Sequence, residues 1–196
     1  MRYIVKKITV INGCEKFNSI EKTVMEALQL NLNLVNAAYD WNDLKDKELR
    51  ICRACDVCQT KKPGLCAIQD GVNEVLRQYI NSDVAIIIAP IAFGCGNSLI
   101  KNFLDRTEPL FLPYQILHKH QTVMKKRYKQ YPHLIFIGIA DNSSEACRNE
   151  FTKFIENSNL FRISDKAQVH IFNKDDNVNE LGKWLETVEG DVLNEA

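Results

Sequence analysis

Residues 84–89 read Val84-Ala85-Ile86-Ile87-Ile88-Ala89, and this stretch decides the fold class. All of its residues are apolar, and many are β-branched, which favours a strand. A strand that is apolar on both sides is typical of a parallel sheet whose two faces are covered by helices. We therefore expect a buried strand here, within an α/β fold, that runs into a loop after Ala92.

On either side of this run, short apolar stretches alternate with segments in which apolar residues recur at helical spacing. The other expected strands are residues 7–11, 34–39, 134–139 and 167–172. The expected helices are residues 19–30, 70–79, 98–106, 144–156 and 178–188. This alternation implies right-handed βαβ crossovers. The sequence thus predicts a five-stranded parallel sheet of order 2-1-3-4-5, with its ligand site beyond the carboxyl ends of the strands.

Two insertions interrupt the alternation. The segment 52–66 holds four of the seven cysteines, and the connector 108–132 is too long for an ordinary loop, which indicates a functional or interfacial role. The chain shows no internal repeat, low-complexity stretch or interdomain linker. We expect one domain spanning residues 1–196, with 52–66 as a cluster-binding segment.

The composition excludes several classes of protein. The 25 basic and 25 acidic residues balance, so we expect neither nucleic acid nor a membrane surface as a partner. No apolar run approaches the ~20 residues needed to span a bilayer, and the N-terminus does not resemble a signal peptide. An odd number of cysteines argues against a fully paired disulfide framework. We expect a soluble, cytoplasmic protein.

The cysteine segment carries the strongest chemical signal. Cys52, Cys55 and Cys58 form a C-x-x-C-x-x-C motif, and Cys66 follows after a Pro63-Gly64 turn. Thiolates with this spacing can converge on an iron–sulfur cubane, with the distant cysteine as fourth ligand. Structural zinc sites usually pair two C-x-x-C motifs across a longer spacer. Zinc, a redox-active dithiol and unpaired surface cysteines remain as alternatives to the iron–sulfur cluster.

Several motifs together resemble the iron–sulfur flavoprotein branch of the flavodoxin-like NADPH-dependent FMN reductase family. Besides the four cysteines, the matching stretches are Gly13-Cys14-Glu15-Lys16, the helix expected from Asp70, Ala89-Pro90-Ile91-Ala92-Phe93, and Lys101-Asn102-Phe103-Leu104-Asp105-Arg106. The resemblance implies a flavodoxin-like three-layer sandwich that carries a 4Fe–4S cluster and FMN and transfers electrons between them. It also implies a homodimer or homotetramer, with a redox protein or NAD(P)H as electron donor or acceptor.

By this resemblance, three loops at the carboxyl ends of strands would bind FMN through backbone N–H groups and hydroxyls. The first loop offers Gly13, Cys14, Lys16, Asn18 and Ser19; the second offers Pro90, Ile91, Ala92, Phe93, Gly94, Cys95, Gly96 and Asn97; the third offers Gly138, Asp141, Asn142 and Ser143. In a simpler interpretation, Asn142 or Ser143 only caps the next helix.

Some positions depart from the family pattern in these loops. Cys14 replaces a serine, Ile20 and Glu21 replace an Asn-Thr pair that helps to hold the phosphate, and Ala92 replaces a tyrosine. A carboxylate at the first turn of a helix would repel a bound phosphate. Two alternative functions follow: an NAD(P)H-dependent flavin or quinone reductase without a cluster, and a flavodoxin-like scaffold that has lost FMN and acts as a binding protein.

The remaining reactive side chains have simpler expected roles. We expect Cys14 and Cys95 to act as small apolar fillers and Cys147 to lie in the core. Lys101 and Asp105 are spaced for a salt bridge on one helix, whereas Arg106 could face the flavin site or a subunit interface. His133 and His170 are expected to be structural, and the basic residues of 118–129 to form a solvated face.

Overall fold

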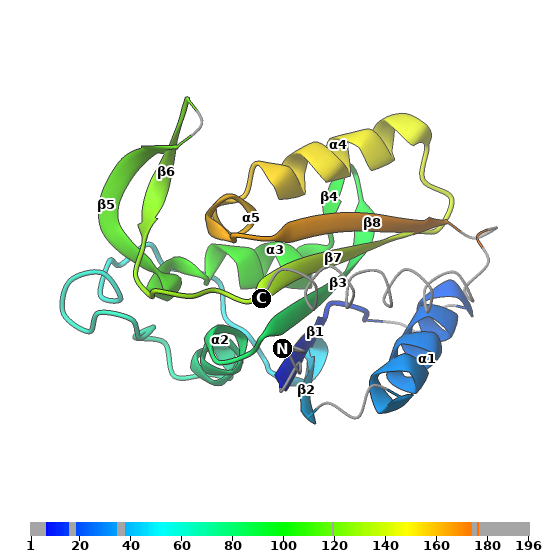
Figure 1. Ribbon diagram of the computed structural model, residues 1–196, viewed down its shortest axis with the longest axis horizontal. Coiled ribbons are helices and arrows are strands. Elements are labelled where there is room, and N and C mark those ends of the chain that lie inside the picture. The colour runs from blue at the N-terminus through cyan, green and yellow to red at the C-terminus, as the bar shows by residue number, and fades with distance from the viewer. Residues whose placement is uncertain (1–6, 16–18, 35–37, 119, 174–175, 177–196) are drawn as a thin grey trace, which may run out of the picture.

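A parallel sheet forms the middle layer of the molecule. The computed structural model describes residues 7–15, 19–34, 38–118, 120–173 and 176. Its five parallel strands lie in the order β2 (Ala38–Asp43), β1 (Lys7–Asn12), β3 (Val84–Ala92), β7 (His133–Ala140) and β8 (Ala167–Asn173) (Figure 1). The short strand β4 (Cys95–Gly96) pairs antiparallel with the end of β3. The expected flavodoxin-like α/β class is confirmed, and the parallel strands follow the expected order.

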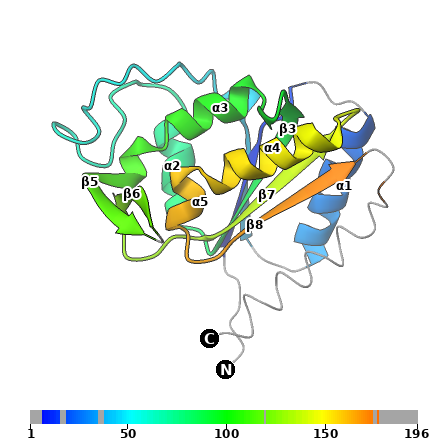
Figure 2. The same cartoon turned by 90° about the horizontal axis from the view of Figure 1, so that it is seen from above.

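Helices cover both faces of the sheet, as the two views show (Figures 1 and 2). One apolar cluster joins the sheet to α1 (Ser19–Leu34). The other joins it to α2 (Val72–Ile80), α3 (Ser98–Asp105), α4 (Glu145–Glu156) and α5 (Asn159–Ile163). Within the described residues, no helix has the length and apolar character needed to cross a bilayer.

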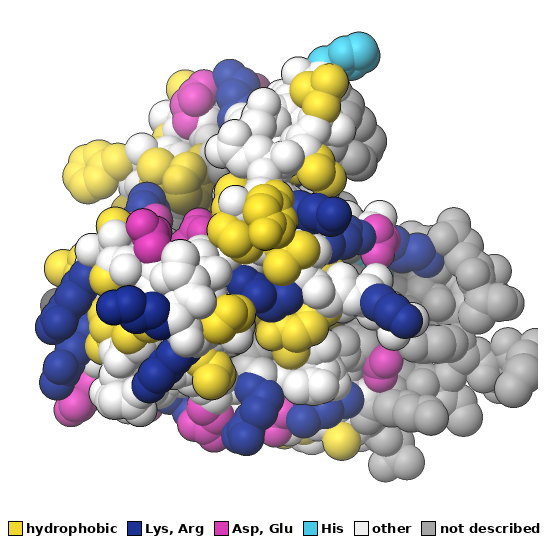
Figure 3. All heavy atoms as spheres, turned by 90° about the vertical axis from the view of Figure 1, so that its left-hand side faces the viewer, with side chains coloured by type: hydrophobic (Ala, Val, Ile, Leu, Met, Phe, Trp, Pro, Cys, Tyr) yellow, Lys and Arg dark blue, Asp and Glu magenta, His cyan; other side chains and the backbone are white. Residues whose placement is uncertain are grey.

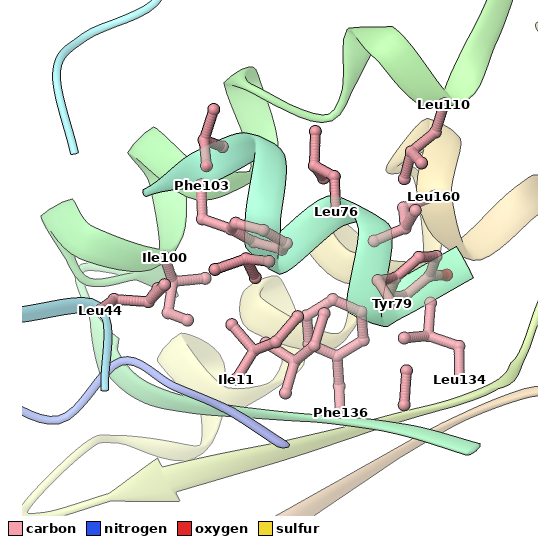
Figure 4. Packing of buried hydrophobic residues seen from close by; sticks show 14 of the residues in the cluster. Ile11, Leu44, Leu76, Tyr79, Ile100, Phe103, Leu110, Leu134, Phe136 and Leu160 are labelled. Atoms are coloured by element: carbon pink, nitrogen blue, oxygen red, sulfur yellow. The ribbon is translucent and has the colours of Figure 1, made fainter. Parts of the chain in front are cut away.

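The central position of β3 explains why its sequence is apolar throughout. Ala85, Ile87 and Ala89 pack on the side of α2 to α5, while Val84, Ile86 and Ile88 pack on the side of α1. On the first side, residues from strands and helices meet in one layer (Figure 4). Each fully buried isoleucine contributes about 1.5–3 kcal/mol to folding, so β3 holds both outer layers to the sheet.

Some element boundaries differ from the expectations. The second strand is Ala38–Asp43 rather than 34–39, because this edge strand is partly exposed and its polar sequence gives little apolar signal. Helix α1 extends to Leu34, and α2 begins at Val72, whose N–H donates to Asp70 Oδ1 at 3.1 Å. The helix expected at residues 178–188 lies outside the described residues.

The connector 108–132 contains a β-hairpin that the sequence did not predict. The strands β5 (Phe111–His118) and β6 (Gln121–Lys126) pair antiparallel and follow directly on the short helix η2 (Glu108–Leu110). A second short helix, η1 (Leu44–Asp46), lies much earlier in the chain, after β2. Leu110 and Phe111 are buried at the base of the hairpin, and Val123, which pairs with Ile116, is buried within β6. The hairpin projects from the body of the molecule, on a face where charged and apolar side chains are interspersed (Figure 3).

Candidate functional site

One cavity brings together the four cysteines of the 52–66 segment. It has a volume of about 650 Å³, and Cys52, Cys55, Cys58 and Cys66 all line it. Helix α3 and the junction of α4 with α5 complete its wall. The cavity therefore lies between the cysteine segment and the helices on one face of the sheet.

Cys66 is the most firmly held of the four. Cys66 is buried. Its N–H donates to Asn73 Oδ1 at 2.8 Å, and its carbonyl accepts from Asn73 Nδ2 at 3.0 Å. Arg106 Nη2 lies 3.3 Å from its sulfur. Backbone and thiol are thus fixed by α2 and by the residue that follows α3.

Arg106 lies in a different place from the one expected. Its side chain is fully buried and pairs with Asp70, with Nη1 2.9 Å from Oδ2 and Nη2 3.0 Å from Oδ1. Nη1 also donates to the carbonyl of Arg50. The expectation that Arg106 faces the flavin site or a subunit interface is therefore wrong, because the ion pair with Asp70 turns it toward the cysteine segment.

The carboxylate of Asp70 is stabilised in its charged form. Burial alone pushes its pKa upward, but hydrogen bonds from Arg106 and from the N–H groups of Arg50 and Val72 hold the pKa below its usual range. Asp70 therefore remains an anionic partner of the buried guanidinium over the physiological pH range.

The other three cysteines lie on an irregular loop with an unusual backbone. Ala54 and Asp56, on either side of Cys55, have φ angles of +47° and +55°. Such angles are uncommon for residues other than glycine and cluster at functional sites. The turn expected at Pro63-Gly64 is present: Gly64 has a φ of +83°, and its N–H donates to the Cys58 carbonyl at 3.0 Å.

Burial and neighbouring acidic groups raise the pKa of a thiol within the cavity. Burial raises the pKa of Cys58 to about 11, with further contributions from Cys66, Glu108 and Cys52. Among the described residues, however, no group of three or more Cys, His, Asp or Glu side chains is close enough to hold a metal ion. The thiols thus share one cavity without forming a closed ligand set.

Residues that flank the hairpin contact the cysteine segment, among them Arg127, which was expected on a solvated face but is partly buried and hydrogen-bonded. Arg127 Nη2 donates to Gln59 Oε1 at 3.0 Å, while Arg127 Nε donates to the Pro109 carbonyl at 2.9 Å. Gln59 Nε2 in turn donates to the Glu108 carbonyl at 2.7 Å. No regular spacing in the sequence indicates these contacts.

The three loops expected to bind FMN lie at the carboxyl ends of β1, β3 and β7. Asn97 joins two of them, because its Nδ2 donates to the Gly13 carbonyl at 2.7 Å while its Oδ1 caps α3 by accepting from Ile100 N–H. A Cβ at Gly13 would lie 2.4 Å from Ile100 Cγ1, and one at Gly96 would lie 2.6 Å from Ile100 Cγ2. These two glycines are thus required for packing against α3.

The second loop presents an aromatic side chain to solvent. Phe93 is fully exposed and has a φ of +50°, and Gly94 follows with a φ of +76°. The N–H of Gly94 donates to the Cys147 sulfur at 3.1 Å. Cys147 is only half-buried, so the expectation of a core position is wrong: its sulfur supports this loop instead. Pro90, Ile91, Ala92 and Cys95 are also only partly buried.

The residue that caps the helix after the third loop is neither of the two that were expected. Ser144 caps α4, its Oγ accepting from Cys147 N–H at 3.2 Å, so neither Asn142 nor Ser143 does. Asn142 has a φ of +60° and donates through Nδ2 to Asp141 Oδ1 at 3.1 Å. A Cβ at Gly138 would lie 2.7 Å from Phe151 Cε1, so that glycine too serves packing.

The first loop is compact around Cys14. This thiol is fully buried in the core, as expected for a filler, and its N–H donates to Asn12 Oδ1 at 3.0 Å. Its pKa is raised by burial and, to a lesser degree, by Glu21 and Asp43. Glu21 is buried in the first turn of α1, which Ser19 begins; Lys16 and Asn18 lie outside the described residues.

Helix α3 links the two regions. Asn97 caps it at the loops expected to bind FMN, and Lys101, Leu104 and Asp105 line the cysteine cavity further along it. The helix has eight residues and therefore spans roughly 12 Å. The expected salt bridge between Lys101 and Asp105 is present at the cavity wall.

Comparisons with known proteins point to one family. The family model for NADPH-dependent FMN reductase matches residues 6–128. Iron-sulfur flavoprotein MJ1083 of Methanocaldococcus jannaschii is 37% identical over 76 residues, which are 39% of this chain and 38% of that protein. An iron-sulfur flavoprotein of Archaeoglobus fulgidus is 28% identical over 102 residues, which are 52% of this chain and 48% of that protein. The match thus spans about half, or less, of each relative.

Solved structures share the fold. The NAD(P)H:quinone oxidoreductase from Methanothermobacter marburgensis superimposes with a TM-score of 0.67 at 12% identity, over 95% of this chain and 98% of that chain. An azoreductase from Bacillus anthracis str. Sterne gives a TM-score of 0.63 at 12% identity, over 97% of this chain and 96% of that chain. At such low identity these structures show the fold alone.

Proposed function

Because the chain belongs to the NADPH-dependent FMN reductase family, we propose that it is an iron–sulfur flavoprotein that transfers electrons between a 4Fe–4S cluster and FMN. The observation that carries this proposal is the single cavity lined by Cys52, Cys55, Cys58 and Cys66. The printed names of the relatives support the same assignment. A redox protein or NAD(P)H supplies or accepts the electrons.

The residues of the cavity fit an iron–sulfur cluster. Four cysteine thiols are the donor set that such clusters use. In addition, Arg106 Nε is buried and has no hydrogen-bond partner among the described residues. Arg106 therefore still has an N–H donor to offer close to Cys66, whose sulfur it contacts. Cys66 is held in place, and the loop of Cys52, Cys55 and Cys58 would close around the metal centre.

Of the three loops expected to bind FMN, the second and third suit the flavin better than the first suits its phosphate. Phe93 and Asn142 have strained backbone angles at the carboxyl end of the sheet, where ligands bind in this fold. At the first loop, the buried Glu21 carboxylate is unfavourable for a dianionic phosphate. We propose that backbone N–H groups of the three loops bind the flavin, while Glu21 lowers the affinity for its phosphate.

When bound, the two cofactors would supply one-electron transfer at the cluster and conversion between one- and two-electron transfer at the flavin. The protein's own part is to hold and space them. Asn97 fixes the flavin loops at one end of α3, and Leu104 shields the cysteine cavity near the other end. The spacing of the two sites is therefore set by a single short helix.

Anaerobic reconstitution with iron and sulfide, followed by a visible spectrum and assays of iron, sulfide and flavin, tests this function. We expect about four irons and four sulfides per chain, together with bound FMN. The variant Cys58→Ser should lose the cluster, whereas Cys147→Ser, outside the cavity, should keep it. A wild-type protein without iron or sulfide after reconstitution would refute the cluster.

One observation favours a second candidate function. Because no three potential ligands of the described residues are close enough to hold a metal ion, the cysteines could be free thiols in an NAD(P)H-dependent flavin or quinone reductase. That function predicts a yellow, iron-free protein that oxidises NAD(P)H in the presence of a quinone. A protein with neither iron nor flavin would instead support a scaffold that has lost FMN.

A further inference from the structure

Arg106 joins the two ends of the cysteine segment to each other. Its Nη1 donates to the carbonyl of Arg50, just before the first cysteine, and to Asp70, just after the last. Asp70 Oδ2 also accepts from the Arg50 N–H at 3.0 Å. We call Arg106, Asp70, Arg50 and Cys66 the Arg106 network; it closes residues 50–70 into a ring.

The network reaches one thiol directly. Arg106 Nη2 lies 3.3 Å from Cys66 Sγ, and this contact is buried. Taking a guanidinium out of water costs several kcal/mol unless it gains anionic partners. Asp70 is one such partner, and the ligating sulfur of Cys66 would be the second.

The rest of the cavity lacks a comparable cation. Asp56, Asp105 and Glu108 add carboxylates to the four thiols of the wall, and the positive Lys101 is already paired with Asp105. Arg53 also lines the cavity, but its residue is exposed, so solvent screens its charge. A negatively charged metal centre in this cavity would therefore depend on Arg106 for buried positive charge.

We infer that Arg106 is the positioning residue of the cysteine site: it holds Cys66 and closes the segment 52–66 before any metal binds, and it offsets the charge of the metal-bound thiolates. This inference rests on the proposed function. The first part, that Arg106 holds Cys66 and closes the segment, concerns the metal-free protein. The second part, that Arg106 offsets the charge of the thiolates, concerns the metal-loaded protein, so each part has its own measurement.

Hydrogen exchange of the metal-free protein tests the first part. Arg106→Gln should raise the exchange rate of amides in residues 52–66 by ~10-fold or more, because a local contact worth more than about 1.4 kcal/mol is lost. Lys101→Gln is the matched control, because it removes one positive charge from the cavity wall, and Lys101 pairs with Asp105 on its own helix rather than with the segment. We expect its exchange to change less than about 2-fold.

The reduction potential of the reconstituted protein tests the second part. Loss of a buried positive charge disfavours the added electron, so Arg106→Gln should have a more negative potential than wild type, and the exposed Lys101→Gln a smaller shift. Arg106→Lys keeps the charge but not the two-pronged hydrogen bonds. It should recover most of the potential while residues 52–66 still exchange rapidly, and it provides the test should Arg106→Gln fail to fold.

The outcomes separate this inference from the proposed function. Wild-type protein that takes up no iron refutes the proposed function and with it the charge role, while the exchange data still decide whether Arg106 closes the segment. A reconstituted wild-type protein whose Arg106→Gln and Arg106→Lys variants match it in exchange and potential would overturn the inference.

Discussion

At the scale of single residues, Ile100 decides which positions around it must be glycine. The chain offers a matched pair to test this: a Cβ at Gly13 would lie 2.4 Å from Ile100 Cγ1, whereas one at Gly71 would first meet the flexible Lys47 side chain at 3.0 Å. We expect Gly13→Ala to lower the free energy of unfolding by about 1–3 kcal/mol, as overpacking does.

Gly71→Ala should have a clearly smaller effect, and Ile100→Ala should partly relieve the effect of Gly13→Ala in the double variant. Urea unfolding of the single and double variants measures these differences. Equal destabilisation by the two alanine substitutions would contradict the packing role of Gly13. The sequence shows the glycine but not Ile100 as its reason, because the two residues are far apart in the chain.

Also at this scale, Asp70 predicts a pH dependence of stability. Its pKa is lower in the folded protein than in the unfolded chain, so its stabilising effect is complete above the unfolded value of ~3.9 and is lost as the pH falls through the folded value. At pH 7, Asp70→Asn should cost about 3–5 kcal/mol, because it leaves the buried Arg106 without its counter-charge.

The difference between wild type and Asp70→Asn should therefore shrink below about pH 4. Urea unfolding of the metal-free proteins between pH 7 and pH 3 measures it. Asp105→Asn, in an exposed pair, serves as control and should cost less than about 1 kcal/mol. A difference that stays constant down to pH 3 would contradict the assigned ion pair.

At the scale of elements, Asn97 both caps α3 and joins two loops. Asn97→Asp keeps the oxygen that accepts from Ile100 N–H but loses the Nδ2 donor to the Gly13 carbonyl. Its cost of about 1–3 kcal/mol would therefore report the lost loop contact together with the charge that aspartate places beside the Gly13 carbonyl. Asn97→Ala should cost about 1 kcal/mol more, the value of the cap. Ser144→Ala, which removes the cap of α4 and no loop contact, gives a reference value for a cap in this protein, measured by thermal unfolding.

Elements with strong apolar periodicity could be predicted from the sequence, and others could not. The sequence predicts β3 and β7 well because both faces of these strands are buried. It misplaces β2, an edge strand, and misses the β5–β6 hairpin, whose exposed strands lack a regular alternation. For the site, spacing alone finds the cysteines, whereas Asn73, Arg106 and Arg127 acquire their roles only from tertiary contacts.

At the scale of the whole molecule, the hairpin is the place where we expect subunits to meet. The family resemblance predicts a homodimer or homotetramer, and β5 exposes Tyr114, Ile116 and Leu117 with exposed fractions of 63%, 42% and 75%. Light scattering should give a dimer or tetramer for wild type and a smaller species for Ile116→Lys/Leu117→Lys. Leu30→Lys, on α1, should leave the mass unchanged. A monomeric wild type would refute the prediction.

The order of the chain has a consequence for how this protein matures. The fourth cysteine is held by a side chain 40 positions further on, beyond β3 and α3. A ribosome that has released only the cysteine-rich stretch exposes its thiols without the residue that orders them. Under the proposed function, insertion of iron should therefore be a late event in biogenesis, after the central strand has joined the sheet, and nascent chains that end before Arg106 should retain little metal.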